Sequence, residues 1–220
     1  MRNAAASAIP TKCLSAEHVC SVGYYGFGKH AQGQLEAICA VRPIKLAYIY
    51  SCSTEKLEAF TQRISKRLGV EVRTSEIQEE PASAADIVVT CTTSFEPVLF
   101  GDWLTKPGLV IGAGANHWNG RELDESIIKK ASLVVVMSAK PPRRRAAHCF
   151  LPFTTALSVG IRSKTLPTLL FSDARFRSST PLAFCSHRMV SRSRTLRYRI
   201  KFTNWRSKRV WGVTSRFNTR

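Results

Sequence analysis

Three small residues in the stretch GYYGFGKHAQGQLEA, residues 23–37, have the spacing G-x-G-x-x-A: Gly26, Gly28 and Ala31. An aromatic, partly apolar stretch precedes them and a helical pattern follows. In that setting the first glycine allows a sharp turn, the second lets the backbone approach a pyrophosphate, and the alanine lets helix and strand pack closely. The N–H groups and dipole at the helix start attract phosphate. The spacing predicts dinucleotide binding; the alternative is a bare tight turn.

The next polar cluster stands where such a fingerprint places a ribose-binding acid, about 20 residues further on. Here the chain has Tyr50, Ser51, Cys52 and Ser53, with no carboxylate among them. A carboxylate would repel a 2′-phosphate, whereas a serine can donate a hydrogen bond to one. The hydroxyls of Ser51 and Ser53 therefore favour NADP over NAD, although Lys56 is the nearest cation in the sequence.

The elements that must position these residues alternate along the chain. Residues 54–68 have Leu57, Phe60, Ile64 and Leu68 on one helical face, and Gly69 predicts the end of that helix. A helix is also expected over 4–16, with Pro10 as a local interruption, and a poor one over 75–85, broken by Pro81. Strands are expected at 19–25, 45–50, 70–74, 86–92, 109–112 and 133–137, and the other helices at 31–41 and 124–131. This alternation predicts an α/β fold with a doubly wound, mostly parallel sheet.

Several longer stretches resemble the ornithine cyclodeaminase/mu-crystallin family: RNAAASA, GFGKHAQGQLEAICAVRPIK, STEKLEAF, ADIVVTCT, EPVLFGDWLTKPG and GANHWNGRELD. The resemblance covers roughly residues 1–138. It implies a Rossmann domain that uses NAD or NADP, an amino acid or cyclic imine as substrate, a homodimer and a cytoplasmic location. Members include ornithine cyclodeaminases, alanine dehydrogenases, ketimine and pyrroline-carboxylate reductases, and mu-crystallins.

The resemblance also implies roles for individual residues. Arg2 matches the family arginine of the R-T-A-A motif at the substrate and cofactor site, although its usual Thr neighbour is Asn3 here. Lys29 and His30 fall beside the phosphates, where His30 is equally well explained as a loop histidine. Three further positions match cofactor-lining residues after the fourth and fifth strands: Thr90, Thr92 and Gly114.

Asn116 stands where ornithine cyclodeaminases have an aspartate that exchanges a proton with the amino group. An amide cannot take up or release a proton at neutral pH. The site therefore favours hydride transfer to an imine over deaminating cyclisation. Ornithine cyclodeaminase and a non-catalytic cofactor-binding protein remain the alternatives. We interpret His117 as a loop histidine, and we expect Arg121 and Glu122 to hold the start of the next helix.

The family's substrate clamp contains a lysine and an arginine that lie ahead of the segment matching Arg2, where this chain has almost nothing. Positioning of a substrate governs rate steeply. We therefore expect a truncated form that binds cofactor with little turnover.

The charge of the chain is distributed very unevenly. Of the formal net charge of +18, residues 1–138 contribute nothing, and residues 139–220 hold 19 of the 33 basic residues with a single acid, Asp173. We therefore divide the chain into a Rossmann domain, 1–138, and a basic, disordered tail, 139–220. A nucleic-acid-binding arm is one interpretation of the tail. We favour a frameshifted or rearranged gene, and expect no nucleic-acid partner.

The seven cysteines include no C-x-x-C pair, so we expect reduced thiols and neither a disulfide framework nor a metal site. No apolar run reaches the roughly 18 residues of a membrane span. The Arg- and Ala-containing N-terminus could indicate a transit peptide, but the family resemblance explains it as an internal segment. A cytoplasmic location follows as the expectation.

Overall fold

The computed structural model describes residues 2–53, 55–106, 108–114 and 121–136, and beyond them the backbone of four short strands. The chain divides into two units, Met1–Arg188 and Met189–Arg220. In the second unit the described part is an antiparallel strand pair, β9 (Arg199–Ile200) and β10 (Val213–Thr214). The boundary predicted after residue 138 falls outside the described residues and stays a prediction.

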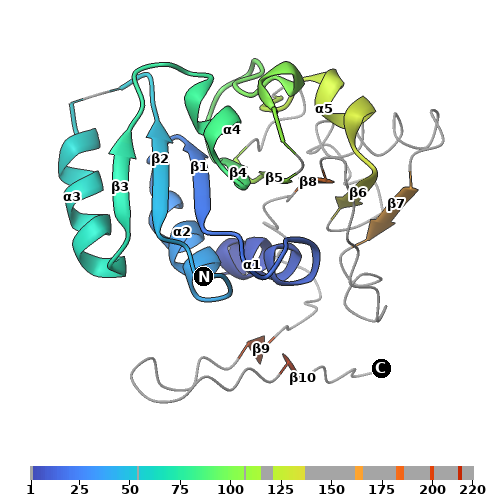
Figure 1. Cartoon of the computed structure of the whole chain (residues 1–220), viewed down its shortest axis with the longest axis horizontal. Coiled ribbons are helices and arrows are strands. Elements are labelled where there is room, and N and C mark those ends of the chain that lie inside the picture. Colours follow the sequence, from blue (N-terminus) through green and yellow to red (C-terminus); the bar gives the residue numbers. More distant parts are fainter. Residues whose placement is uncertain are drawn as a thin grey trace, which may run out of the picture. The chain divides into compact units, whose positions relative to one another are not determined.

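The first unit contains a parallel sheet, whose strands stand side by side in Figure 1 in the order β3-β2-β1-β4-β5-β8-β6-β7. Every described pairing in this sheet is parallel. Its strands are β1 (Ser21–Tyr25), β2 (Leu46–Tyr50), β3 (Glu71–Thr74), β4 (Ile87–Thr90), β5 (Leu109–Gly112), β6 (Leu133–Val136), β7 (Arg162–Thr165) and β8 (Leu182–Cys185). The α/β class and the parallel sheet predicted from the sequence are confirmed.

Helices cover both faces of the sheet: α1 (Arg2–Leu14), α2 (Ala31–Cys39), α3 (Leu57–Leu68), α4 (Glu80–Ala84) and α5 (Glu125–Lys130), with a short 3-10 turn at Gly101–Trp103. Successive side chains of a strand point to opposite faces. Accordingly, Val89 of β4 joins a core with α1, α2 and α3, and its neighbour Val88 joins a second core with α4 and α5. Both cores are buried, so the central strands β1, β4 and β5 are buried along their whole length.

Local sequence explains where the helices begin and end. Gly69 has a φ of 65° and closes α3, as predicted, because only glycine takes this left-handed conformation without strain. At the start of α5 the Asp124 side chain accepts a hydrogen bond from the Ile127 N–H at 3.1 Å. Two proline expectations differ from the structure. Pro10 lies inside α1, and Pro81 lies in the first turn of α4, where its missing N–H has no helical partner to lose.

Two strands of the basic tail belong to the sheet, which the sequence did not predict. β8 lies between β5 and β6, and β7 pairs with the other side of β6. In the rest of 139–220, apart from β9 and β10, the residues lie outside the described part. The expectation of disorder in the tail therefore stays a prediction, although residues 162–165 and 182–185 form the strands β7 and β8.

Candidate functional site

The turn of Gly26 and Gly28 lies where the order of the sheet reverses. β1 pairs with β2 on one side and with β4 on the other. β3 lies beyond β2, and β5 lies beyond β4. Ligands of open parallel sheets bind at the carboxyl ends of the strands beside such a reversal. The turn follows the carboxyl end of β1 and leads into α2, so the predicted motif has the context that it requires.

Gly26 makes the sharp turn. Its φ is 90°, and its N–H donates to the Tyr50 carbonyl oxygen at 2.8 Å. A Cβ at this position would stand 2.8 Å from the carbonyl oxygen of Cys91 and 3.2 Å from Cγ2 of Thr92. The turn is therefore held close to the ends of both neighbouring strands, β2 and β4, and a side chain would force them apart.

Gly28 differs from Gly26, because a Cβ there would meet no protein atom within 4 Å. The residue is exposed, and its carbonyl oxygen accepts a hydrogen bond from the Ala31 N–H at 2.9 Å. Ala31 is fully buried at the start of α2 and belongs to the first core. Lys29 is exposed and His30 half-buried in the same turn. Gly28 thus leaves free the space that a pyrophosphate at the helix N-terminus would take.

An aromatic contact joins the turn to α3. The ring of Phe27, between the two glycines, lies 5.7 Å from the ring of Phe60, and the guanidinium of Arg63 lies 5.6 Å from the centre of the Phe60 ring. Ser51 and Ser53 follow the carboxyl end of β2, the strand next to β1, and the Ser53 N–H donates to the Ser51 hydroxyl oxygen at 3.3 Å. Sequence reasoning missed Arg63, whose only signal is its place one turn after Phe60.

A buried carboxylate organises the loops after β4 and β5. Glu122 is 3% exposed. Its Oε1 accepts hydrogen bonds from the Thr92 N–H at 2.6 Å and from the Thr92 hydroxyl at 2.9 Å, and its Oε2 accepts one from the Gly114 N–H at 2.7 Å. Two residues predicted to line a cofactor, Thr92 and Gly114, are therefore held together by one side chain. Thr90, also predicted, is fully buried at the end of β4.

The role expected for Glu122 at the helix start was wrong, because its carboxylate is used inside these loops. Asp124 caps α5 instead, and Arg121 pairs with Glu125 at 3.2 Å on the exposed surface. A buried phenol stands near the carboxylate. Burial raises the pKa of Tyr24 well above its ordinary value, and the neighbouring Cys91 and the charge of Glu122 raise it further. Tyr24 is therefore protonated at neutral pH.

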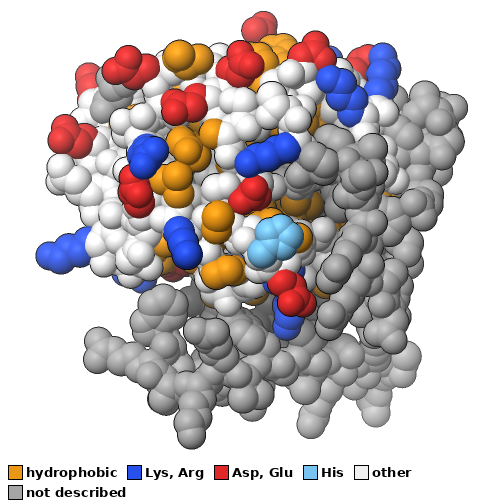
Figure 2. Space-filling model, in the orientation of Figure 1, with side chains coloured by type: hydrophobic (Ala, Val, Ile, Leu, Met, Phe, Trp, Pro, Cys, Tyr) orange, Lys and Arg blue, Asp and Glu red, His pale blue; other side chains and the backbone are white. Residues whose placement is uncertain are grey.

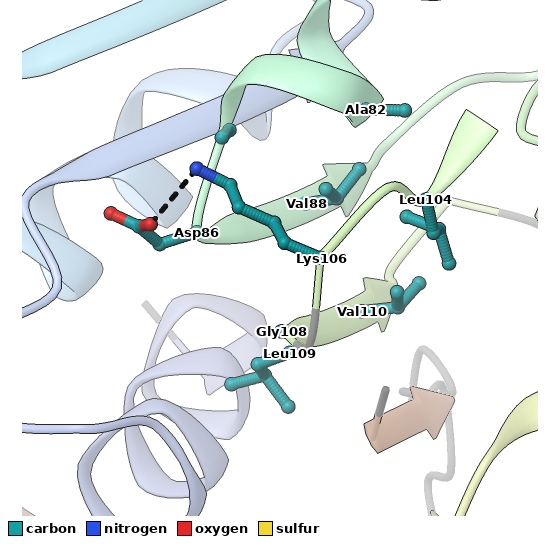
Figure 3. A pocket seen from close by; sticks show the side chains of 9 residues that line it. Ala82, Asp86, Val88, Leu104, Lys106, Gly108, Leu109 and Val110 are labelled. Atoms are coloured by element: carbon teal, nitrogen blue, oxygen red, sulfur yellow. Dashed lines mark ion pairs between the residues drawn. The ribbon is translucent and has the colours of Figure 1, made fainter. Parts of the chain in front are cut away.

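Three predicted residues cannot be placed. Asn116 and His117 lie outside the described residues, as does the side chain of Arg2, whose backbone begins α1. The structure does bring together the turn after β1, the serines after β2 and the loops after β4 and β5. In contrast, the depression in Figure 3 lies beside Asp86 and Gly108, which precede β4 and β5 and thus mark the amino edge of the sheet. Its enclosed volume, about 0 Å³ for a molecule the size of water, is too small for a dinucleotide.

Surface charge, possible metal ligands, cysteines and helix length are further features of the described residues that bear on the kind of site. Figure 2 shows Lys and Arg side chains interspersed with Asp and Glu side chains over the visible face. Among the described residues, no three His, Cys, Asp or Glu residues gather as metal ligands would, and no disulfide joins any of the five described cysteines. In the same part of the chain, none of the helices has the length and apolar character needed to cross a bilayer.

Comparison with known proteins finds relatives of about two thirds of the chain. The chain is 37% identical over 147 residues to a putative dehydrogenase of Rhizobium meliloti, covering 66% of this chain and 44% of that protein. It is 34% identical over 157 residues to Delta(1)-pyrroline-2-carboxylate reductase of Bacillus cereus, covering 71% and 48%. The chain spans less than half the length of the curated relatives that it matches.

A solved structure resembles a larger part of the chain than these sequence relatives do. Delta(1)-pyrroline-2-carboxylate reductase of Thermococcus litoralis, in complex with NADH and L-proline, matches with a TM-score of 0.75 and 28% identity, over 84% of this chain and 58% of that one. Residues 1–138 make up less than two thirds of the chain, so this match also includes part of the basic tail.

Fold and site together define a Rossmann-type α/β protein with a glycine turn at the carboxyl edge of its parallel sheet. The family model for ornithine cyclodeaminase/mu-crystallin matches residues 1–145, and the chain belongs to that family.

Proposed function

We propose that this chain carries the cofactor site of an NAD(P)-dependent oxidoreductase acting on an amino acid or an imine. The observation that carries the proposal is the turn of Gly26 and Gly28 at the carboxyl edge of the sheet, leading into α2. Relatives named as a dehydrogenase and a pyrroline-carboxylate reductase support it, and so does a solved relative that holds NADH.

The residues present fit a nicotinamide dinucleotide. The open space at Gly28 and the N–H groups of the first turn of α2 suit a pyrophosphate, and Lys29 adds positive charge. Thr90 at the buried end of β4, the half-buried Thr92 and the buried Gly114 would line the nicotinamide half on the side of β4 and β5. When bound, the nicotinamide supplies or accepts the hydride. The chain's own residues bind and orient it.

Asn116 is the basis for preferring a reductase to a cyclodeaminase. Its amide can orient a substrate by hydrogen bonds but cannot accept the proton that a deaminating route must move. In this proposal Arg2 contributes at the substrate side. Homodimerisation and a cytoplasmic location complete the proposal. The five described cysteines form no disulfide, which suits a reducing compartment.

The preference for NADP over NAD is a finer part of the proposal. The four residues after Ile49 of β2 include no carboxylate, and Ser51 and Ser53 offer hydroxyls. Arg63 on α3 brings a cation to the same side of the glycine turn through the Phe60–Phe27 contact. Titration of the full chain with NADPH and NADH tests this preference, and clearly tighter binding of NADH would reject it.

The function itself is tested with the full 220-residue chain. We expect saturable binding of NADH or NADPH, followed by nucleotide fluorescence, and loss of that binding in Gly28→Asp, whose carboxylate would repel the phosphates. Oxidation of NADH or NADPH is then followed by absorbance with Delta(1)-pyrroline-2-carboxylate. Cyclodeamination of ornithine would regenerate its nicotinamide cofactor, so turnover of ornithine is measured separately as release of ammonia. Faster turnover of the imine supports a reductase, and equal turnover of ornithine supports a cyclodeaminase. Failure to bind either dinucleotide would overturn the proposal.

A further inference from the structure

Glu122 connects three separate segments at the carboxyl edge of the sheet. Its carboxylate binds Thr92, after β4, through Oε1 and Gly114, after β5, through Oε2. Its backbone carbonyl oxygen accepts from the Val98 N–H at 2.9 Å and from the Leu99 N–H at 3.1 Å. A single residue thereby fixes the separation of two loops that flank the proposed cofactor site.

Only a carboxylate satisfies these donors. Two backbone N–H groups, of Thr92 and Gly114, point at different oxygens of the same side chain. A glutamine of the same shape would have to turn its NH₂ group toward one of them, which sets donor against donor and leaves a buried N–H unsatisfied. Burial of a charge is unfavourable unless hydrogen bonds compensate it, and here the bonds from Thr92 and Gly114 contribute to that compensation.

The carboxylate also sets the direction of the Thr92 hydroxyl. Because an ionised carboxylate only accepts, the Thr92 O–H donates to Glu122, and its oxygen accepts from the Ser94 N–H at 3.2 Å. Thr92 is therefore held by contacts on both sides within the chain. Its backbone cannot move away from Gly114 without breaking one of the bonds to Glu122.

We propose that Glu122 is a positioning residue, which holds Thr92 and Gly114 where the nicotinamide half of the cofactor binds. This inference rests on the proposed function, since it assumes that a nicotinamide dinucleotide occupies the crevice. The adenosine half would contact the β1–β2 side, with Gly26, Gly28 and the serines, whereas the hydrogen bonds of the Glu122 carboxylate described above go to Thr92 and Gly114. Loss of the carboxylate should therefore affect the two halves of the cofactor differently.

The test compares NADH with ADP, which has the adenosine and phosphate groups but no nicotinamide. In the full chain we expect Glu122→Gln to raise the Kd for NADH about tenfold and to change the Kd for ADP by less than about twofold. The matched control is Glu125→Gln, a neighbouring carboxylate that is 57% exposed and pairs only with surface cations among the described contacts. We expect it to leave both Kd values unchanged.

Two further variants keep the inference open to disproof. If Glu122→Gln does not fold, Thr92→Val replaces the hydroxyl that donates to Glu122 with a methyl group. This variant should bind NADH more weakly and ADP with unchanged affinity. Thr92→Ser keeps the hydroxyl and should retain NADH binding. An unchanged NADH affinity, or an equal loss for NADH and ADP, would overturn the positioning role. If the unaltered chain bound ADP but neither NADH nor NADPH, the proposed function would fail, and this inference with it.

Discussion

At the scale of single residues, the two glycines of the turn differ in why glycine is present. Gly26 has a positive φ and faces the Cys91 carbonyl, so the protein's own backbone requires it. Gly28 has open space beside it, and nothing in the described part of the chain requires it to be glycine. The close approach of a ligand would explain a glycine at a position where the protein's own packing does not need one.

The first prediction concerns Gly26. Gly26→Ala should destabilise the fold by about 1–2 kcal/mol, because an L-residue at this φ is strained and its Cβ would crowd the Cys91 carbonyl oxygen. Urea unfolding measures the loss. Gly28→Ala is the comparison and should stay within about 0.5 kcal/mol of the unaltered chain. Equal stability of the two variants would show that the turn relaxes around a side chain.

The sequence predicted the glycine turn because the constraint is local: spacing, strand and helix follow one another within 15 residues. It could not predict the role of Glu122, whose partners lie 30 and 8 residues away. An acid just before a helix is ordinarily a helix-start residue, and only the packing of two loops against it shows otherwise. Arg63 was missed for the same reason, since its approach to the turn depends on how Phe60 meets Phe27.

At the scale of elements, a polar cluster ties β1 to β4 at the amino edge. The Asp86 Oδ2 accepts from the N–H groups of Cys20 and Ser21 and from the Ser21 hydroxyl, and Lys106 pairs with Oδ1 at 3.2 Å (Figure 3). Burial raises the pKa of Asp86, but these hydrogen bonds outweigh it and hold the pKa below its ordinary value.

A pH dependence follows from that direction. A carboxyl whose pKa is lower in the folded state stabilises the fold above its unfolded pKa of about 4, and the contribution is lost as pH falls through the folded pKa. Asp86→Asn should therefore cost about 1–2 kcal/mol at neutral pH and progressively less as the pH falls below about 4. Urea unfolding at several pH values measures the difference.

The control for this prediction is Asp102→Asn. Asp102 pairs with Lys130 at 2.7 Å, but its side chain is 86% exposed, so solvent screens the pair. Its loss should change stability by less than about 0.5 kcal/mol at any pH. A loss in Asp86→Asn that was the same at neutral and acid pH would contradict a role for the ionised carboxylate.

At the scale of the whole molecule, the sheet extends into the basic tail. Residues 182–185 form β8 between β5 and β6 although Arg-rich sequence surrounds them. The sequence alone could not show this, because a four-residue strand has no measurable period and charge dominated the composition of the tail. The match to the pyrroline-carboxylate reductase structure over 84% of the chain agrees with a tail that contributes to the fold.

A proline tests the place of β8. Ala183 pairs with Val110 of β5 and Val134 of β6, so Ala183→Pro would remove an N–H from an inner strand. We expect the Tm of the full chain to fall by about 5 °C. Val213→Pro, in the strand pair of the second unit, is the control and should leave that transition unchanged. An unaltered Tm in Ala183→Pro would favour the disordered tail that the sequence predicted.

The central claim is that the turn after β1 binds the phosphates of a nicotinamide dinucleotide, and Gly28→Ala tests it most directly. Gly33→Ala in the first turn of α2 is the matched control, because it keeps the backbone N–H and its Cβ would lie 3.7 Å from the Cβ of Ala4 in α1, an ordinary contact. Titrating the full chain with NADH and NADPH, we predict that Gly28→Ala raises the Kd about tenfold at unchanged stability, and that Gly33→Ala leaves it unchanged. Equal affinity in all three proteins would contradict the account.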